Sequence, residues 1–355
     1  MFGRVGYAPK YVHPRTPRSP GRRRRERALA VSTSRNIGPR PGRPFCAMPI
    51  SGGLMAAKQI LVVVDPTTDE KQPVIERAAW LAERTGAAVE LFACDYDANI
   101  DAGRVATVWI PEAGARERLL LRHRRKLEEL AAPLRERGLS VTVDVAWDYP
   151  LADAICKRAA AELPWLLAKG AQHHTPLERT LLTHTDWQLV RESPVPLLLV
   201  KRPALASKPV VLAAIDPLHV HDKPAVLDDA IYKFAAVLSE SCGGTLHLVH
   251  AAAPPMGIEL APQLQALIAS ESRRAIAKFV ETHPVADSNV HVLEGVPEVC
   301  LESAVKQQHA DFLVMGAVAR RGVKRLLIGS TAARVLDRLP CDIVVIKPAE
   351  LVLPH

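Results

Sequence analysis

The feature that most constrains this chain is a long internal repeat. An apolar run ends in Asp65 in the first half of the sequence and in Asp216 in the second half, and a proline follows both aspartates. A later apolar run ends in Lys201 and again in Lys347. The two matches are offset by 151 and 146 residues, which is the length of a domain and too long for one solenoid unit. The sequence therefore predicts two tandem copies of one domain, named here the first and the second repeat.

The positive charge of the chain is confined to its beginning. The formal net charge is +8, but residues 1–55 hold twelve Lys or Arg and one acid, Glu26, and the remainder carries a balance of −3. The body is therefore mildly acidic. Phosphate backbones need a basic face, so this balance predicts no nucleic-acid partner.

Residues 1–55 are rich in Pro, Gly, Arg and Ser and show no periodic apolar face. This composition predicts a disordered Arg/Pro-rich extension. Met48 and Met55 both stand just before the first strand, and we favour Met55 as the biological start. Two other interpretations stay open: an Arg-rich targeting peptide, and contact of the arginine run 22–25 with polyanions.

The cysteines and the apolar segments indicate a cytoplasmic protein. Six cysteines are scattered without a C-x-x-C pair, and most stand in apolar runs, which is typical of reduced core residues. No apolar stretch reaches the ~18 residues that a membrane span requires, so we expect no membrane partner.

Apolar strands alternate with helical segments in both repeats, which predicts an α/β fold with parallel sheets and right-handed crossovers. We expect domains at 56–203 and 208–348, followed by a tail at 349–355. In the first repeat the predicted strands are 60–64, 88–94, 141–147, 165–169 and 196–201, and the helices are 73–85, 115–137, 151–162 and 185–192. In the second repeat the strands are 210–215, 245–250, 289–293, 312–315 and 342–346, and the helices are 225–241, 262–282, 297–308 and 331–338.

One pattern in the second repeat carries chemistry. Ligands of open parallel sheets lie beyond the carboxyl ends of the strands, where three segments of this repeat converge. Glycines allow a tight turn or a close approach to phosphate, and hydroxyls at a helix N-terminus form an anion site. Arginines and a lysine in the loop between the glycines would neutralise phosphate charge. The candidate nucleotide-binding residues are Asp216, Met315, Gly316, Ala319, Gly329, Ser330 and Thr331.

This pattern resembles the G-x2-G-x9-G-[ST] motif of the universal stress protein family, and the likeness extends over about 56–348. The resemblance implies two tandem adenine-nucleotide alpha-hydrolase-like domains, each a five-stranded parallel sheet of order 3-2-1-4-5. It also implies a pseudo-dimer in which the two last strands pair. Asp216 matches the family residue that contacts the nucleoside part of ATP.

Both repeats depart from the motif. In the second repeat Ala319 stands at the second glycine position, where a methyl group would crowd a phosphate. A second interpretation of the motif stays open, in which Gly316, Gly329 and Ser330 form only a turn and a helix cap without a ligand. In the first repeat Gly170 remains, but His173 and His184 replace the later glycines.

The first repeat is therefore not expected to bind ATP in the family manner. Its segments resemble the His-rich first half of tandem family members. His173, His174, His184 and Asp186 either converge on Zn²⁺ or form a hydrogen-bond network that orders the loop, with Trp187 packed beneath it.

The leading hypothesis is a cytoplasmic stress-response binding protein that holds ATP or a related adenine nucleotide in its second repeat. No P-loop, dinucleotide fingerprint, nucleophile elbow or H-E-x-x-H motif occurs. No catalytic residue is therefore assigned, and the expected enzymatic activity is at most that of a slow ATPase. Two alternatives stay open: a ligand-free scaffold for a regulatory protein, and a nucleotidyl or phosphoryl transferase. The chain is expected to be an intramolecular pseudo-dimer, either as a monomer or in a higher homo-oligomer.

Overall fold

The computed structural model describes residues 58–101, 114–171, 182–202, 204, 206–218, 225–252, 262–317 and 330–348. Ten strands form one sheet in the order β3-β2-β1-β4-β5-β10-β9-β6-β7-β8. Within each repeat the strands follow the order 3-2-1-4-5, and all neighbours inside a repeat are parallel. The predicted fold class is therefore confirmed.

The elements of the first repeat agree closely with the sequence pattern. Helix α1 has the predicted bounds 73–85, and Gly86 closes it with a left-handed φ of 69°. A short helix, α2, was not predicted. The elements are β1 (Gln59–Val63), α1 (Pro73–Thr85), β2 (Ala88–Asp95), α2 (Ala98–Asp101), α3 (Ala115–Glu136), β3 (Val141–Trp147), α4 (Leu151–Glu162), β4 (Leu166–Gly170), α5 (His184–Glu192) and β5 (Leu197–Val200).

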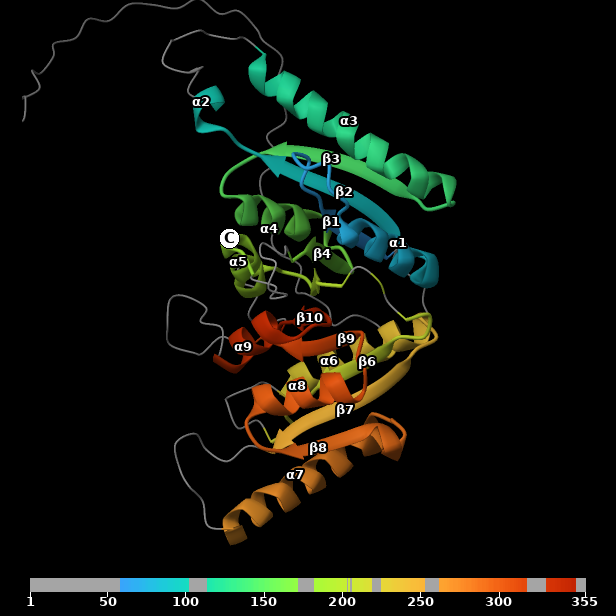
Figure 1. Ribbon diagram of the computed structural model, residues 1–355, viewed down its shortest axis with the longest axis vertical. Helices are drawn as coiled ribbons and strands as arrows, with labels where there is room; N and C mark the ends of the chain where they lie inside the picture. The colour runs from blue at the N-terminus through green and yellow to red at the C-terminus, as the bar shows by residue number, and fades with distance from the viewer. Residues whose placement is uncertain are drawn as a thin grey trace, which may run out of the picture. The chain divides into compact units, whose positions relative to one another are not determined.

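The second repeat has the same succession of strands and long helices, with a 3-10 turn, η1, between α7 and β8. Its elements are β6 (Val210–Ala214), α6 (Ala225–Ser241), β7 (Thr245–Ala252), α7 (Pro262–Thr282), η1 (Asp287–Asn289), β8 (Val290–Glu294), α8 (Pro297–Gln307), β9 (Phe312–Gly316), α9 (Ser330–Arg338) and β10 (Asp342–Ile346). Figure 1 shows α3 lying along β3 and α7 along β8, at the outer strands of the two repeats.

Alternate residues of each strand feed two separate apolar cores. Ile60 and Val62 of β1 belong to the core that α1, α3, α6 and α7 cover. Leu61 and Val63 belong to the core that α4, α5, α8 and α9 cover. Successive side chains of a strand point to opposite faces, so a parallel sheet with helices on both faces needs the continuous apolar runs seen in the sequence.

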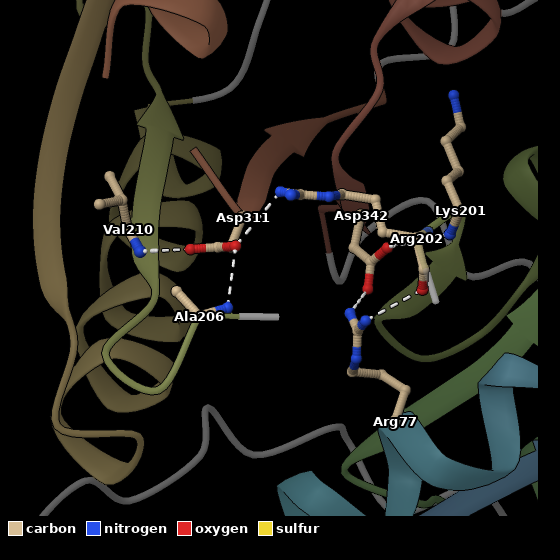
Figure 2. A network of polar contacts seen from close by, with 7 residues as sticks. All are labelled: Arg77, Lys201, Arg202, Ala206, Val210, Asp311 and Asp342. Atoms are coloured by element: carbon tan, nitrogen blue, oxygen red, sulfur yellow. Dashed lines mark hydrogen bonds and ion pairs between the residues drawn. The ribbon is translucent and has the colours of Figure 1, made fainter. Parts of the chain in front are cut away.

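The two repeats join through their last strands. β5 and β10 pair antiparallel, with Leu198 opposite Val344, which confirms the predicted pairing. Asp342, at the start of β10, accepts hydrogen bonds from the backbone N–H groups of Lys201 and Arg202 at 2.9 and 3.1 Å and from the Arg77 guanidinium (Figure 2). Burial and the nearby Arg202 lower the pKa of Arg77 to about 10.

The segment between the repeats is fixed by a second carboxylate. Asp311 accepts hydrogen bonds from the backbone N–H of Val210 at 3.0 Å and of Ala206 at 3.4 Å, and from the Arg202 side chain at 3.2 Å (Figure 2). Asp342 and Asp311 together thus hold both ends of the connection. Within the described ranges, no helix combines the length and apolar character needed to cross a membrane.

Candidate functional site

Asp216 lies at the carboxyl end of β6, as the sequence predicted. Its backbone N–H donates to Asp228 Oδ1 of α6 at 2.9 Å. His250 of β7 donates from Nδ1 to the carbonyl of Ile215 at 3.0 Å, because a carbonyl can only accept. The Asp216 carboxylate lies 3.9 Å from His250 Nδ1, and the Asp216 side chain is 25% exposed. The backbone of Asp216 is therefore fixed while its carboxylate faces solvent in part.

The equivalent Asp65 in the first repeat is held differently. Its backbone N–H and carbonyl both bond the side-chain amide of Gln72, at 2.9 and 2.8 Å. Its carboxylate accepts two hydrogen bonds from Thr67, one from the backbone at 2.8 Å and one from the hydroxyl at 2.6 Å. The first repeat thus uses this carboxylate to close its own turn, which the second repeat does not do with its described residues.

Gly316 has a packing role that the sequence did not predict. It is the last residue of β9 and pairs with Ile346 in the strand ladder, so it does not form the expected tight turn. A Cβ at this position would lie 2.6 Å from Leu227 and 3.2 Å from Ile231, both on α6. The missing side chain therefore lets α6 approach the sheet. At Gly170 a Cβ would meet nothing nearer than 3.8 Å.

Some of the remaining motif residues lie outside the residues that the structure describes. Met315 is buried in β9 and contributes to the core under α8 and α9. Ser330 and Thr331 begin α9, as the anion-site interpretation requires. Ala319 and Gly329, the basic loop residues between them, and the side chains of Ser330 and Thr331 lie outside the described residues. The structure thus brings Asp216 and Gly316 to one edge of the sheet on the neighbouring strands β6 and β9.

In the first repeat, a carboxylate of the protein itself covers the corresponding helix start. Asp186 Oδ2 accepts hydrogen bonds from the Thr183 N–H and hydroxyl at 2.7 and 2.8 Å, which forms a capping box at the start of α5. Asp186 Oδ1 also lies 2.6 Å from the Lys169 ammonium, and Asp186 is fully buried. An internal anion therefore already occupies this helix N-terminus.

The matching positions of the second repeat carry no charge. Met315 corresponds to Lys169, because each precedes the glycine that ends its strand, and Ala332 corresponds to Asp186 as the third residue of the last helix. In this register Thr183, and not His184 as expected from the sequence, stands at the position of Gly329. The exchange of a Lys–Asp pair for Met and Ala is visible in the sequence only when the two repeats are aligned with each other, because neither repeat has a motif at these positions. Helix α5 therefore has a carboxylate of its own at its third residue, and helix α9 does not.

The zinc hypothesis finds no support among the described residues. No group of three or more His, Cys, Asp or Glu there is arranged to hold a metal. Asp186 is engaged by Lys169 and Thr183, and His184 is an exposed first residue of α5. His173 and His174 lie outside the described residues.

Two histidines of the sheet form a pair that sequence reasoning missed. His247 Nδ1 lies 2.9 Å from His291 Nε2 on the neighbouring strand β8, with the rings stacked. Burial lowers the pKa of both imidazoles, and the proximity of His291 lowers that of His247 further. His250 stands three residues further along β7 and therefore lies on the opposite face, where it bonds the Ile215 carbonyl.

A groove of about 310 Å³ lies between α6 and α7, beside Pro217, the residue that follows Asp216. Its walls include Asp228, Phe279 and His283. His283 Nε2 lies 3.0 Å from Asp229, and its ring stacks on Phe279 with the centroids 3.9 Å apart. The bond from the Asp216 N–H to Asp228 links this groove to the candidate site.

These features define a tandem pair of doubly wound α/β repeats with a partly exposed aspartate at the carboxyl edge of the second sheet. The sequence model of the universal stress protein family matches the chain twice, over residues 56–201 and 211–347. Because these matches cover most of the chain, the protein belongs to the universal stress protein family.

Two curated relatives match this chain over a length that spans both repeats. Universal stress protein E of Escherichia coli K12 is 27% identical over 307 residues, which cover 84% of this chain and 96% of that protein. Universal stress protein E of Photorhabdus laumondii is 28% identical over 303 residues, which cover 82% and 95% of the two chains.

Solved structures share the architecture. A protein of Pseudomonas aeruginosa PAO1 described as functionally unknown superimposes with a TM-score of 0.66 at 28% identity, covering 84% of this chain and 95% of that one. A universal stress protein of Archaeoglobus fulgidus gives a TM-score of 0.57 at 18% identity over 82% of this chain and 99% of that one. The latter likeness concerns the fold alone.

Proposed function

We propose that this protein is a cytoplasmic stress-response binding protein whose second repeat holds ATP or a related adenine nucleotide. In this proposal the first repeat is structural, and residues 56–203 and 208–348 form the two domains behind an extension at 1–55. The observation that carries the proposal is the difference between the two helix starts: Asp186 and Lys169 fill one, and Ala332 and Met315 replace them at the other.

The charge logic of the two repeats supports a ligand anion in the second. A helix N-terminus presents unpaired N–H groups and the positive end of the helix dipole. In the first repeat the Asp186 carboxylate accepts from the Thr183 N–H, and the Thr183 hydroxyl accepts from the Asp186 N–H. At α9 the equivalent Ala332 has no such group, so a phosphate is the natural counterpart. Ser330 and Thr331 would bond the phosphate oxygens.

The environment of Asp216 supports a role at the nucleoside end of the ligand. Asp228 fixes the backbone of Asp216, and His250 fixes the adjoining carbonyl of Ile215. The carboxylate is therefore preorganised as an acceptor for hydroxyl groups such as those of a ribose. His250, 3.9 Å from this carboxylate, donates its Nδ1 proton to the Ile215 carbonyl and so is not free to act as a general base through that nitrogen. Binding rather than turnover is therefore the proposed activity.

The proposal is tested by equilibrium binding of ATP to the full chain, with Asp216→Asn as the variant and Asp65→Asn as its matched control. Hydrogen bonds to a charged group contribute about 1.5–3 kcal/mol. The Asp216 variant should therefore bind ATP on the order of tenfold to a hundredfold more weakly. The Asp65 variant should bind like the wild type. No measurable ATP binding by the wild type at millimolar nucleotide rejects the proposal.

A second candidate, a ligand-free scaffold for a regulatory protein, is favoured by one observation. The packing of Gly316 against Leu227 and Ile231 explains this glycine without any ligand. If the wild type binds no adenine nucleotide, while purified chain retains a protein partner that the same chain with Asp216→Asn also retains, the scaffold is the better account.

A further inference from the structure

Each repeat ends in a lysine that crosses into the other repeat. Lys201, after β5, donates from Nζ to the carbonyl oxygens of Leu336 and Leu339, the latter at 3.1 Å, at the C-terminal end of α9. Lys347, after β10, donates from Nζ to the carbonyl of Ser193 at 2.8 Å, at the C-terminal cap of α5. The last strand of each repeat is thereby tied to the last helix of the other.

Lys201 is buried, and Lys347 is partly buried. Lys201 is 5% exposed, and burial lowers its pKa to about 8. Burial lowers the pKa of Lys347 more, to about 7. Figure 2 shows the Lys201 side chain directed away from Asp342, so this carboxylate binds the backbone of Lys201 and not its ammonium.

The titratable groups that face Lys201 oppose the effect of burial on its pKa. They are Cys341, just before β10, and the carboxylates of Asp337 on α9 and Asp186 on α5. The desolvation of Lys201 outweighs these three groups, which is why its pKa still falls.

Fewer groups face Lys347. Glu192 of α5 and the thiol of Cys156 on α4 are its electrostatic neighbours. Within the described ranges, no carboxylate lies within ion-pair distance of its Nζ. The Ser193 carbonyl is a good acceptor for either form of the amine, but only the uncharged form avoids the cost of burying a charge without a counterion.

We propose that Lys201 and Lys347 form a proton-controlled clasp between the two repeats. Uptake of protons by these amines weakens the tie of each last helix to the opposite repeat, and loss of protons tightens it. The clasp does not depend on nucleotide binding, because it uses only contacts of the protein with itself. It acts at the C-terminal end of α9, opposite the end where Ser330 and Thr331 begin the helix.

The direction follows from proton linkage. An amine with a lowered pKa binds fewer protons in the closed state than in an open, hydrated state, so the closed state gains stability as the pH rises from about 7 towards the ordinary lysine range. As the pH falls through the lowered values, the gain is lost. The clasp is thus tight at pH 8.5 and loosened at pH 6.

Two buried cysteines beside the clasp provide the readout. Cys341 is fully buried near Lys201, and Cys156 is 2% exposed near Lys347. The full chain is labelled at pH 6 and at pH 8.5 with an aromatic disulfide reagent that reacts at acid pH. Each labelling rate, read site by site by mass spectrometry, is divided by the rate in denaturant at the same pH, which removes the intrinsic pH dependence of the thiol. Cys242, buried at the end of α6, is the internal control.

The expected result is a loss of protection at Cys341 and Cys156 of about tenfold between pH 8.5 and pH 6, with Cys242 unchanged. Lys201→Met with Lys347→Met should abolish this pH dependence, whereas Lys306→Met, at an exposed ion pair on α8, should leave it intact. Equal protection of Cys341 and Cys156 at both pH values in the folded wild type overturns the proposal. This wild-type comparison decides the matter even if the double variant fails to fold.

Discussion

Replacing Asp186 by Ala is the most informative single perturbation of the first repeat. The change leaves the Lys169 ammonium, whose side chain is 12% exposed, without its ion-pair partner and removes the Asp186 half of the capping box, while Thr183 remains the N-cap. Removing one partner of a buried ion pair costs about 3–5 kcal/mol, and losing half of a capping box costs less than the roughly 1 kcal/mol of a whole helix cap. Because Lys169 retains some contact with water, we expect a loss of about 3–4 kcal/mol.

The assay is chemical denaturation of the full chain, supported by calorimetry. A loss of this size should lower Tm by roughly 10 °C. Lys169→Met combined with Asp186→Ala installs the residues of the second repeat, Met315 and Ala332, and removes the unpaired charge. The double variant should therefore recover about 2 kcal/mol relative to Asp186→Ala alone.

The anion interpretation adds a ligand-based readout. Inorganic phosphate should stabilise Asp186→Ala more than the wild type, because phosphate can take the place of the missing carboxylate beside Lys169. The reasoning is refuted if Asp186→Ala lowers the free energy of unfolding by less than about 1 kcal/mol. It is also refuted if the double variant is less stable than Asp186→Ala alone.

Two further predictions concern stability. Gly316→Ala should cost about 1–3 kcal/mol in denaturation, because its Cβ would overlap Leu227, whereas Gly170→Ala should be nearly neutral; equal costs would contradict the packing role. The lowered pKa values of His247 and His291 mean that the folded state binds fewer protons than the unfolded state, so the stability they contribute is present above pH 6.5 and lost as the pH falls. His247→Asn should make the urea midpoint fall less between pH 7 and pH 5 than it does in the wild type, and an unchanged fall would exclude the pair as its cause.

Local structure could be predicted from the sequence because its signals are local. The apolar run before Asp65 and the glycine at 86 mark a strand and a helix end without reference to the rest of the chain. The strand order and the pairing of β5 with β10 came from the family resemblance, and the structure confirms both.

Contacts between the repeats could not be predicted, because nothing in the sequence marks the partners. Arg77 and Asp342 are 265 residues apart, and neither belongs to a motif. Asp311 and Arg202 are separated by 109 residues. Each of these charges taken alone is typical of a solvated surface, and only the fold shows that Asp342 and Arg77 are buried.

The candidate site was predicted only in part, because some of its contacts also join residues that are distant in the sequence. Asp216 lies where the motif placed it, at the end of β6. Gly316 was assigned to a turn, because a sequence shows a glycine but not the helix that packs on it. The capping box of Asp186 with Thr183 has a local spacing and was overlooked, whereas the ion pair of Asp186 with Lys169 has no local signal, because Lys169 comes from β4.

Native mass spectrometry of the full chain with ATP tests the central claim most directly. If the second repeat holds the nucleotide and Asp186 blocks the first, a single nucleotide should bind each chain, and Asp216→Asn should remove it. Two nucleotides per chain, or one that persists in the Asp216 variant and disappears with Asp65→Asn, would contradict the account.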